Sequence, residues 1–368
     1  MKKTLAAVAV LGAFAGSALA ADVTLYGVVD LGLHYTHADE NGEKSNDWGM
    51  ESGQNSGSRI GFKGTEQLAD DVTVGFVLET QFDATEGKNK TNFFHRESRL
   101  FVQTAYGELG FGRYGALDST TGPYDLGGDI HATTGVADVG DTGVIFLGQN
   151  SRHNSAITYK SPNFGGLTVL AQFANGADDT ENGSYSTDNN RYFALGASYD
   201  IGGLHSALVV SRTDWKKGEA YVYGEDAGKK VDDSTVVTGG VSYDFGITKA
   251  FVAGQYFDGV KASTLEKVDG EAVEGHAKGY GVTLGAKTPV IGGTLTTQVG
   301  YSDAEAVENE DVKYEAWNVG AIYEYPLSKR TKVYGAVGYQ KQENKYDAAK
   351  YEYEVKGVNA GFGMVHNF

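Results

Sequence analysis

The stretch VTVGFVLETQFD, residues 72–83, decides the fold class of this chain. In an extended strand, successive side chains point to opposite faces. One face of this stretch is apolar, with Val72, Val74, Phe76, Leu78 and Phe82, and the other carries Thr73, Glu79, Gln81 and Asp83. A soluble barrel keeps an apolar face inside, whereas a membrane barrel with a wet lumen needs an uncharged outer stripe and accepts charges inside. The two carboxylates therefore favour a membrane barrel.

The same alternation occurs at both ends of the chain. Near the start, the apolar face holds Val23, Leu25, Val29, Leu31, Leu33 and Tyr35, opposite Thr24, Tyr26, Asp30 and His34. Near the end, an uncharged stripe holds Val358, Ala360, Phe362, Met364 and Phe368, and His366 interrupts it. The composition of 52 Gly, 23 Tyr and 17 Phe is typical of a β-rich chain with many turns. No cysteine is present, so no disulfide framework supports the fold.

Short and long polar links alternate strictly between the strand-like segments. The short links are residues 67–71, 106–108, 161–166, 200–203, 245–246, 289–293 and 326–331. The long links are residues 38–53, 84–92, 116–150, 176–189, 215–233, 259–275, 303–311 and 342–354. This asymmetry is typical of outer-membrane barrels, which have short periplasmic turns and long extracellular loops. Seven short and eight long links predict an all-β, sixteen-stranded antiparallel transmembrane barrel over residues 21–368.

A barrel of sixteen strands is too wide for side chains to fill, so the strand number predicts an aqueous channel. The link 116–150 is the longest and the richest in glycine. Long loops in compact folds are usually functional. We expect this segment to fold into the lumen as a constriction loop.

The first twenty residues have the features of a cleaved signal peptide. Two lysines, Lys2 and Lys3, precede an apolar run from Leu5 to Gly16, and residues 18–20 form a small-x-small cleavage site. The whole chain carries 31 basic and 48 acidic residues. This acidity, without any cluster of lysines and arginines, argues against a nucleic-acid partner.

Several motifs together resemble the general trimeric porins of Gram-negative outer membranes, of the β-proteobacterial and neisserial type. They are ADVTLYGVVDLGL at 21–33, GSRIGFKGTEQLADDVTVGFVLE at 57–79, YGELGFGRYGAL at 106–117, NSAITYKSPNFGGLTVLAQF at 154–173, YPLSKRTKVYG at 325–335 and the terminal GMVHNF. The resemblance implies a homotrimer in outer-membrane lipid and lipopolysaccharide, whose third long loop faces a wall of arginines. Phe368 resembles the terminal aromatic that the barrel-assembly machinery recognises, although it could also be an ordinary aromatic of the interfacial girdle.

The resemblance assigns wall residues one by one. Arg59 and Arg152 match wall arginines, and strand alternation puts both on the lumen face, with Lys63 beside Arg59. On the next wall strand the family position is Arg96, but alternation favours Arg99, so both stay candidates. Arg113 also fits a family arginine, but its neighbours Leu109 and Phe111 indicate a structural role.

The loop supplies acidic candidates that could face these arginines. They are Asp118, Asp125, Asp129, Asp138 and Asp141. Aspartate beside glycine and threonine is more often a turn residue, so we expect only one or two of the five to face the wall. Opposed charges across a narrow, water-filled gap order water and admit small polar solutes.

These features predict passive diffusion of ions and small hydrophilic solutes, with weak selectivity and a slight preference for anions. A substrate-specific channel for sugars or dicarboxylates is the alternative, because Tyr114, Tyr124 and Phe146 could line the path. An enzyme is disfavoured, because the eight histidines are scattered and no catalytic motif occurs. An adhesin would show internal repeats, and none is found. No cofactor or metal site is expected.

Overall fold

The computed structural model describes residues 22–89, 92–149, 151–176, 189–215, 232–262, 275–307, 309–346 and 351–368. The predicted signal peptide lies outside these ranges. The strands are β1 (Asp22–Glu40), β2 (Glu43–Ser52), β3 (Arg59–Ala69), β4 (Val72–Asp83), β5 (Lys88–Asn89), β6 (Glu97–Thr104), β7 (Gly107–Gly115), β8 (Arg152–Lys160), β9 (Leu167–Ala174), β10 (Arg191–Ile201), β11 (Leu204–Asp214), β12 (Ser234–Asp244), β13 (Lys249–Ala262), β14 (Gly275–Val290), β15 (Gly293–Ala306), β16 (Val312–Pro326), β17 (Thr331–Tyr346) and β18 (Tyr351–Asn367). One short helix, α2 (Leu126–Asp129), lies between β7 and β8.

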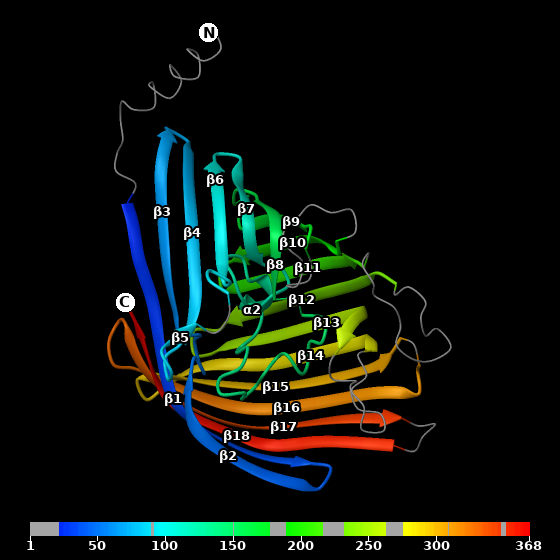
Figure 1. The fold of residues 1–368 in the computed structure, drawn as a ribbon. Helices are drawn as coiled ribbons and strands as arrows, with labels where there is room; N and C mark the ends of the chain where they lie inside the picture. The colour runs from blue at the N-terminus through cyan, green and yellow to red at the C-terminus, as the bar shows by residue number, and fades with distance from the viewer. Residues whose placement is uncertain are drawn as a thin grey trace.

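Sixteen of these strands form a closed antiparallel barrel, which confirms the predicted strand number. β2 and β5 are the two additional strands: β2 extends the β1 ladder, and β5 pairs only with the end of β4. The barrel closes where β1 pairs with β18, from Val28 opposite Asn367 to Glu40 opposite Val355. Figure 1 shows β1 and β18 side by side at this seam. The ring of sixteen strands therefore has no terminal strand, as a structure in hydrocarbon requires.

The predicted division into two faces is confirmed along the strands. Outward residues of the first and last strands are exposed, with Leu25 at 53% and Phe362 at 62%, whereas the inward Asp30 is completely buried. Exposed apolar side chains on this scale are expected for a surface that lipid covers. The inner face carries polar and charged residues, together with the apolar residues that pack against the loop.

Several links predicted as long loops are partly strand. β17 and β18 stay paired up to Tyr346 opposite Tyr351, so most of the predicted link 342–354 belongs to this hairpin. The link 38–53 likewise contains β2, which pairs back onto β1. Polar side chains on both faces hid these extensions in the sequence, because backbone pairing continues beyond the apolar band.

The segment 116–149 lies inside the ring of strands, together with α2 (Figure 1). Its buried apolar residues, among them Leu117, Ile130, Ile145 and Phe146, form one core cluster with inward residues of the wall from β8 to β16. Hydrogen bonds reinforce the contact: Tyr314 donates to the carbonyl of Val144 at 2.8 Å, and the amide of Gly148 donates to Gln255 at 2.9 Å. The loop therefore fills one side of the lumen.

Glycines in the wall provide the space for this packing. A Cβ atom added at Gly281 would overlap the carbonyl group of Ile145, and one at Gly320 would overlap the side chain of Val139. A Cβ atom at Gly361, in β18, would overlap the side chain of Ala137 in the loop. The loop can approach the wall this closely because these wall positions lack a side chain.

Candidate pore lining and constriction

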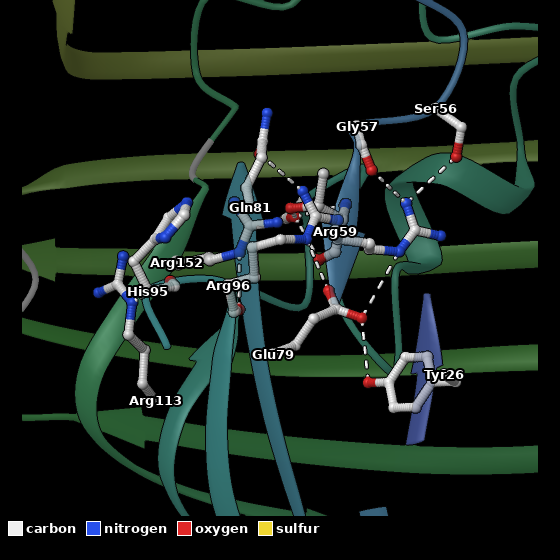
Figure 2. Close-up of polar contacts among 12 residues, drawn as sticks. Tyr26, Ser56, Gly57, Arg59, Glu79, Gln81, His95, Arg96, Arg113 and Arg152 are labelled. Carbon is white, nitrogen blue, oxygen red and sulfur yellow. Dashed lines mark hydrogen bonds and ion pairs between the residues drawn. The ribbon is translucent and has the colours of Figure 1, made fainter. Parts of the chain in front are cut away.

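Glu79 of β4 is the centre of a charged network on the inner wall. Its Oε1 lies 2.6 Å from Nε of Arg96, and its Oε2 lies 3.5 Å from Nε of Arg59. Tyr26 donates a hydrogen bond to the same Oε2 at 3.0 Å. Figure 2 shows Glu79 between the two guanidinium groups, with Arg152 next to Arg96. We call Arg59, Arg96 and Arg152 the arginine row.

Each member of the row is fixed by further hydrogen bonds. Arg59 donates to the hydroxyl of Ser56 at 3.1 Å and to the carbonyl of Gly57 at 3.0 Å. Arg96 donates to the side-chain oxygen of Gln81 at 3.0 Å, and Arg152 donates to the carbonyl of Arg96 at 2.8 Å. The guanidinium groups are thus held at set positions on the wall, and Glu79 is shared between two of them.

The open choice between Arg96 and Arg99 came from strand alternation, and Arg96 lies outside the strand. β6 begins at Glu97, and Phe94 just before it has a positive φ of 52°. Arg96 itself lies in the bend between this turn and β6, where strand alternation does not apply, so it reaches the inner wall although it has the parity of the outward Leu100. Arg99 also points inward, but away from the row.

Arg99 has partners of its own, which include Tyr124 at the start of the loop. It forms ion pairs with Glu97 and with Glu108, the second at 2.8 Å, and its side chain is 11% exposed. Its guanidinium lies 5.5 Å from the ring centre of Tyr114 and 5.8 Å from that of Tyr124. Tyr124 in turn donates to Glu108. These contacts anchor Tyr124, in the first part of the loop, to β6 and β7.

Arg113 contacts His95 and Asn154, which lie close to the arginine row. It donates to the carbonyl of His95 at 2.5 Å and to the side chain of Asn154 at 2.7 Å, and Figure 2 shows it beside His95. A register shift between Gly112 and Tyr114 interrupts the alternation on which the sequence argument relied. Burial lowers the pKa of His95, and the charges of Arg152, Arg96 and Arg113 lower it further, whereas the hydrogen bond of its ring to the carbonyl of Asn92 raises it.

The five candidate aspartates occupy different environments. Asp118 is 1% exposed and accepts hydrogen bonds from Tyr192 at 3.0 Å and from Ser211 at 2.6 Å, so it ties the loop to β10 and β11. Asp141 caps a turn by accepting from the amide of Gly143 at 2.8 Å. Asp138 is exposed and adopts a positive φ of 59°. The structure places these three in anchoring or turn positions.

Asp125 and Asp129 differ, because both line a cavity beneath the loop. This cavity of about 260 Å³ is also lined by Lys287, Glu324 and Lys332. Burial, and then the negative charge of Asp129, raise the pKa of Asp125 to about 7. The cavity therefore combines charges of both signs.

Five lysines point inward near the end of the barrel that has the short turns. The sequence identified only one of them, Lys63. Lys63 lies 5.2 Å from the ring centre of Tyr26, and Lys160 lies 5.5 Å from that of Tyr124. Lys249 and Lys287 flank the buried ring of Phe251, and Lys332 pairs with Glu324. Strand alternation close to each short link could have identified the other four.

The aromatic residues behind the substrate-specific alternative are buried rather than exposed to the channel. Tyr114 and Phe146 have exposures of 0% and 1%, and Tyr124 has 8%. They pack between the loop and the wall. In the described part of the chain, no group of three or more metal-ligand side chains comes together.

Phe368 sits at the seam of the barrel. Its amide donates to the carbonyl of Gly27 at 3.1 Å, and its own carbonyl accepts from the amide of Gly27 at 3.2 Å. Its ring covers Gly27, where a Cβ atom would clash. The last residue of the chain thus extends the pairing that closes the barrel.

Comparison with known proteins agrees with this architecture. A family model described as "Gram-negative porin" matches residues 6–345. Outer membrane porin protein 32 of Delftia acidovorans is 29% identical, over 98% of this chain and 95% of that protein, and the major outer membrane protein P.IB of Neisseria meningitidis is 27% identical over the full length of both.

Solved structures agree as well. The anion-selective porin from Comamonas acidovorans has a TM-score of 0.69 and 26% identity, covering 95% of this chain and all of that one. OmpT of Vibrio cholerae, at 15% identity and a TM-score of 0.65, shares the fold. The resemblance inferred from the motifs is confirmed, and this chain belongs to the Gram-negative porins, channel-forming barrels of the outer membrane that are not enzymes.

Proposed function

We propose that this porin is a homotrimeric general-diffusion channel with a preference for small anions, and that residues 116–150 form its constriction. The observation that carries the anion preference is the arginine row, in which one carboxylate, that of Glu79, is shared between Arg59 and Arg96. Positive charge fixed on a narrow lumen attracts anions and repels cations.

The inward lysines support the same preference at the periplasmic entrance. Lys63, Lys160, Lys249, Lys287 and Lys332 lie near the short turns, which are periplasmic in this family. The solved Comamonas porin, 26% identical to this chain, is described as anion-selective. The acidic outer loops act in the opposite direction, but salt screens them beyond about 10 Å at 0.1 M.

The packing of residues 116–149 supports their role as a constriction. The loop fills the lumen along one side, so solutes must pass between the loop and the wall where β3 and β4 hold Arg59 and Glu79. A transverse field from fixed charges on this wall would order water and disfavour lipophilic solutes.

Assembly is part of the proposal. We expect the signal peptide to be cleaved before Ala21, the barrel-assembly machinery to recognise Phe368, and three barrels to associate within outer-membrane lipid and lipopolysaccharide. The apolar outer face allows association, because one side of a barrel can exchange lipid for a neighbouring barrel.

Planar-bilayer recording of the purified protein tests this function. We expect current steps in groups of three and a reversal potential, in a potassium chloride gradient, that indicates weak anion preference. Strong cation preference would contradict the role of the arginine row. Single, uncorrelated steps would contradict the trimer, and a small conductance blocked by one sugar or diacid would favour the substrate-specific alternative.

A further inference from the structure

The cavity beneath the loop lies off the arginine row and has a distinct composition. Its charged lining comes from α2 and its cap on one side, with Asp125 and Asp129, and from β14, β16 and β17 on the other, with Lys287, Glu324 and Lys332. The other polar residues of the lining are Asn55, Thr120, His131, Thr133, Thr134 and Thr296.

On the barrel side, the three charged residues differ in how they are paired. Lys332 forms an ion pair with Glu324, which also accepts a hydrogen bond from the Asn55 amide at 2.8 Å. Lys287 takes part in no ion pair within the described ranges, although its ammonium lies 5.3 Å from the ring centre of Phe251. Lys332 thus compensates the charge of Glu324. Lys287 is the positive group of this lining that can bind a solute.

On the loop side, the two carboxylates of Asp125 and Asp129 have no cation of the loop beside them within the described residues. Asp125 lies partly buried at the start of α2, and Asp129 is exposed. The ammonium of Lys287 and the carboxylates of Asp125 and Asp129 therefore border one water-accessible space of about 260 Å³.

We propose that this cavity is a binding subsite for small zwitterionic solutes, molecules of amino-acid size that carry one carboxylate and one ammonium group. The carboxylate would contact Lys287, and the ammonium would contact Asp125 and Asp129. This inference rests on the proposed channel function, because the cavity must be reached through the lumen.

The two signs of charge determine the solute class. A simple anion attracted to Lys287 would meet the carboxylates of α2, and a simple cation attracted to these carboxylates would meet Lys287. A neutral solute gains neither interaction. Only a molecule that carries both charges pairs with both sides, because each of its charged groups then has an opposite partner.

The test is a titration of single-channel current at about 0.1 M potassium chloride, where screening is modest. The probe is γ-aminobutyrate, and the size-matched controls are butyrate, butylammonium and butyramide. We expect γ-aminobutyrate to reduce the current in a saturable way, with butyramide giving only the small, non-saturable decrease due to volume.

Two variants test whether γ-aminobutyrate blocks the current by binding in this cavity. Lys287→Met and Asp129→Asn should each raise the half-blocking concentration of γ-aminobutyrate by about tenfold, since each removes one charged contact. Lys329→Met, in the β16–β17 turn and outside the cavity lining, is the matched control and should leave the block unchanged.

Three outcomes would overturn the proposal. These are equal block by butyrate, equal block by butyramide, or a wild-type channel that conducts normally without saturable block. In each of them the channel function stands, because ion current is still measured. A protein that inserts but carries no current would instead refute the channel function itself.

Discussion

Glu79 holds Arg96 through a 2.6 Å ion pair between Oε1 and Nε, although Arg96 precedes its strand and has the parity of an outward residue. The same carboxylate also faces Arg59. One glutamate thus sets the positions of two arginines on the wall and reduces the charge that the row presents to passing ions.

Glu79→Gln should make the channel more anion-selective. Glutamine accepts hydrogen bonds but carries no charge, so the row loses its internal counter-charge while its shape is kept. The reversal potential in a salt gradient should shift in the anion direction. Glu305→Gln, in the outer part of β15, is a control of equal charge change and should shift the potential less. An unchanged potential in Glu79→Gln would show that the row lies away from the ion path.

Removing positive charge from the arginine row should shift the reversal potential in the opposite direction, toward lower anion preference. A combined Arg59→Gln and Arg152→Gln variant removes two of its three positive charges and should lower anion preference below that of the wild type. Arg330→Gln, in the exposed β16–β17 turn, is the control for loss of a basic residue. If both variants shift the reversal potential equally, the row has no special role in selectivity.

Gly281→Ala should displace the loop from the wall. The new methyl group would overlap the carbonyl of Ile145, and overpacking of this kind costs about 1–3 kcal/mol. We expect a lower unfolding temperature and noisier single-channel currents. Gly254→Ala is the matched control on the neighbouring strand, because a Cβ atom there would have no neighbour closer than 3.8 Å. Equal stability of the two variants would contradict the close loop-to-wall packing.

Selectivity should depend on pH near neutrality because of Asp125. Its pKa of about 7 means that the carboxyl group is largely ionised at pH 8 and largely protonated at pH 6. Lowering the pH across this range removes negative charge beside Lys287 and should therefore increase anion preference. His131, nearby in the loop, should stay neutral, because burial lowers its pKa to about 4.

Asp125→Asn provides the check on this assignment. The variant cannot ionise, so its reversal potential should stay constant between pH 6 and pH 8, near the value of the wild type at pH 6. A variant that keeps the full pH response would assign the titration to another group.

The same raised pKa has a consequence for stability. An aspartate that holds its proton more tightly when folded than when unfolded contributes stability at low pH, and this contribution is lost as the pH rises through about 7. Asp125→Asn should therefore be more stable than the wild type at pH 8 and similar to it near pH 4, as thermal unfolding at the two pH values would measure.

The sequence by itself determined the barrel: its strand number, its two faces and the position of its longest loop. A membrane imposes a two-residue period on every strand and requires every backbone group to be paired, so these features are local and repeat along the chain. Arg59 could be placed on the lumen face for the same reason, because it starts β3 and shares its alternation.

Only the tertiary structure decided which charged groups meet. Arg96 joins the row from a turn, where strand alternation does not apply. Arg113 follows a register shift after Gly112, so alternation does not predict its direction either. Asp118 and Asp125 look alike in the sequence, yet Asp118 accepts a hydrogen bond from Tyr192 of β10, and Asp125 lines the same cavity as Lys287. Such pairings join residues far apart in the chain, so no local pattern encodes them, and they exist only once the barrel has closed around its loop.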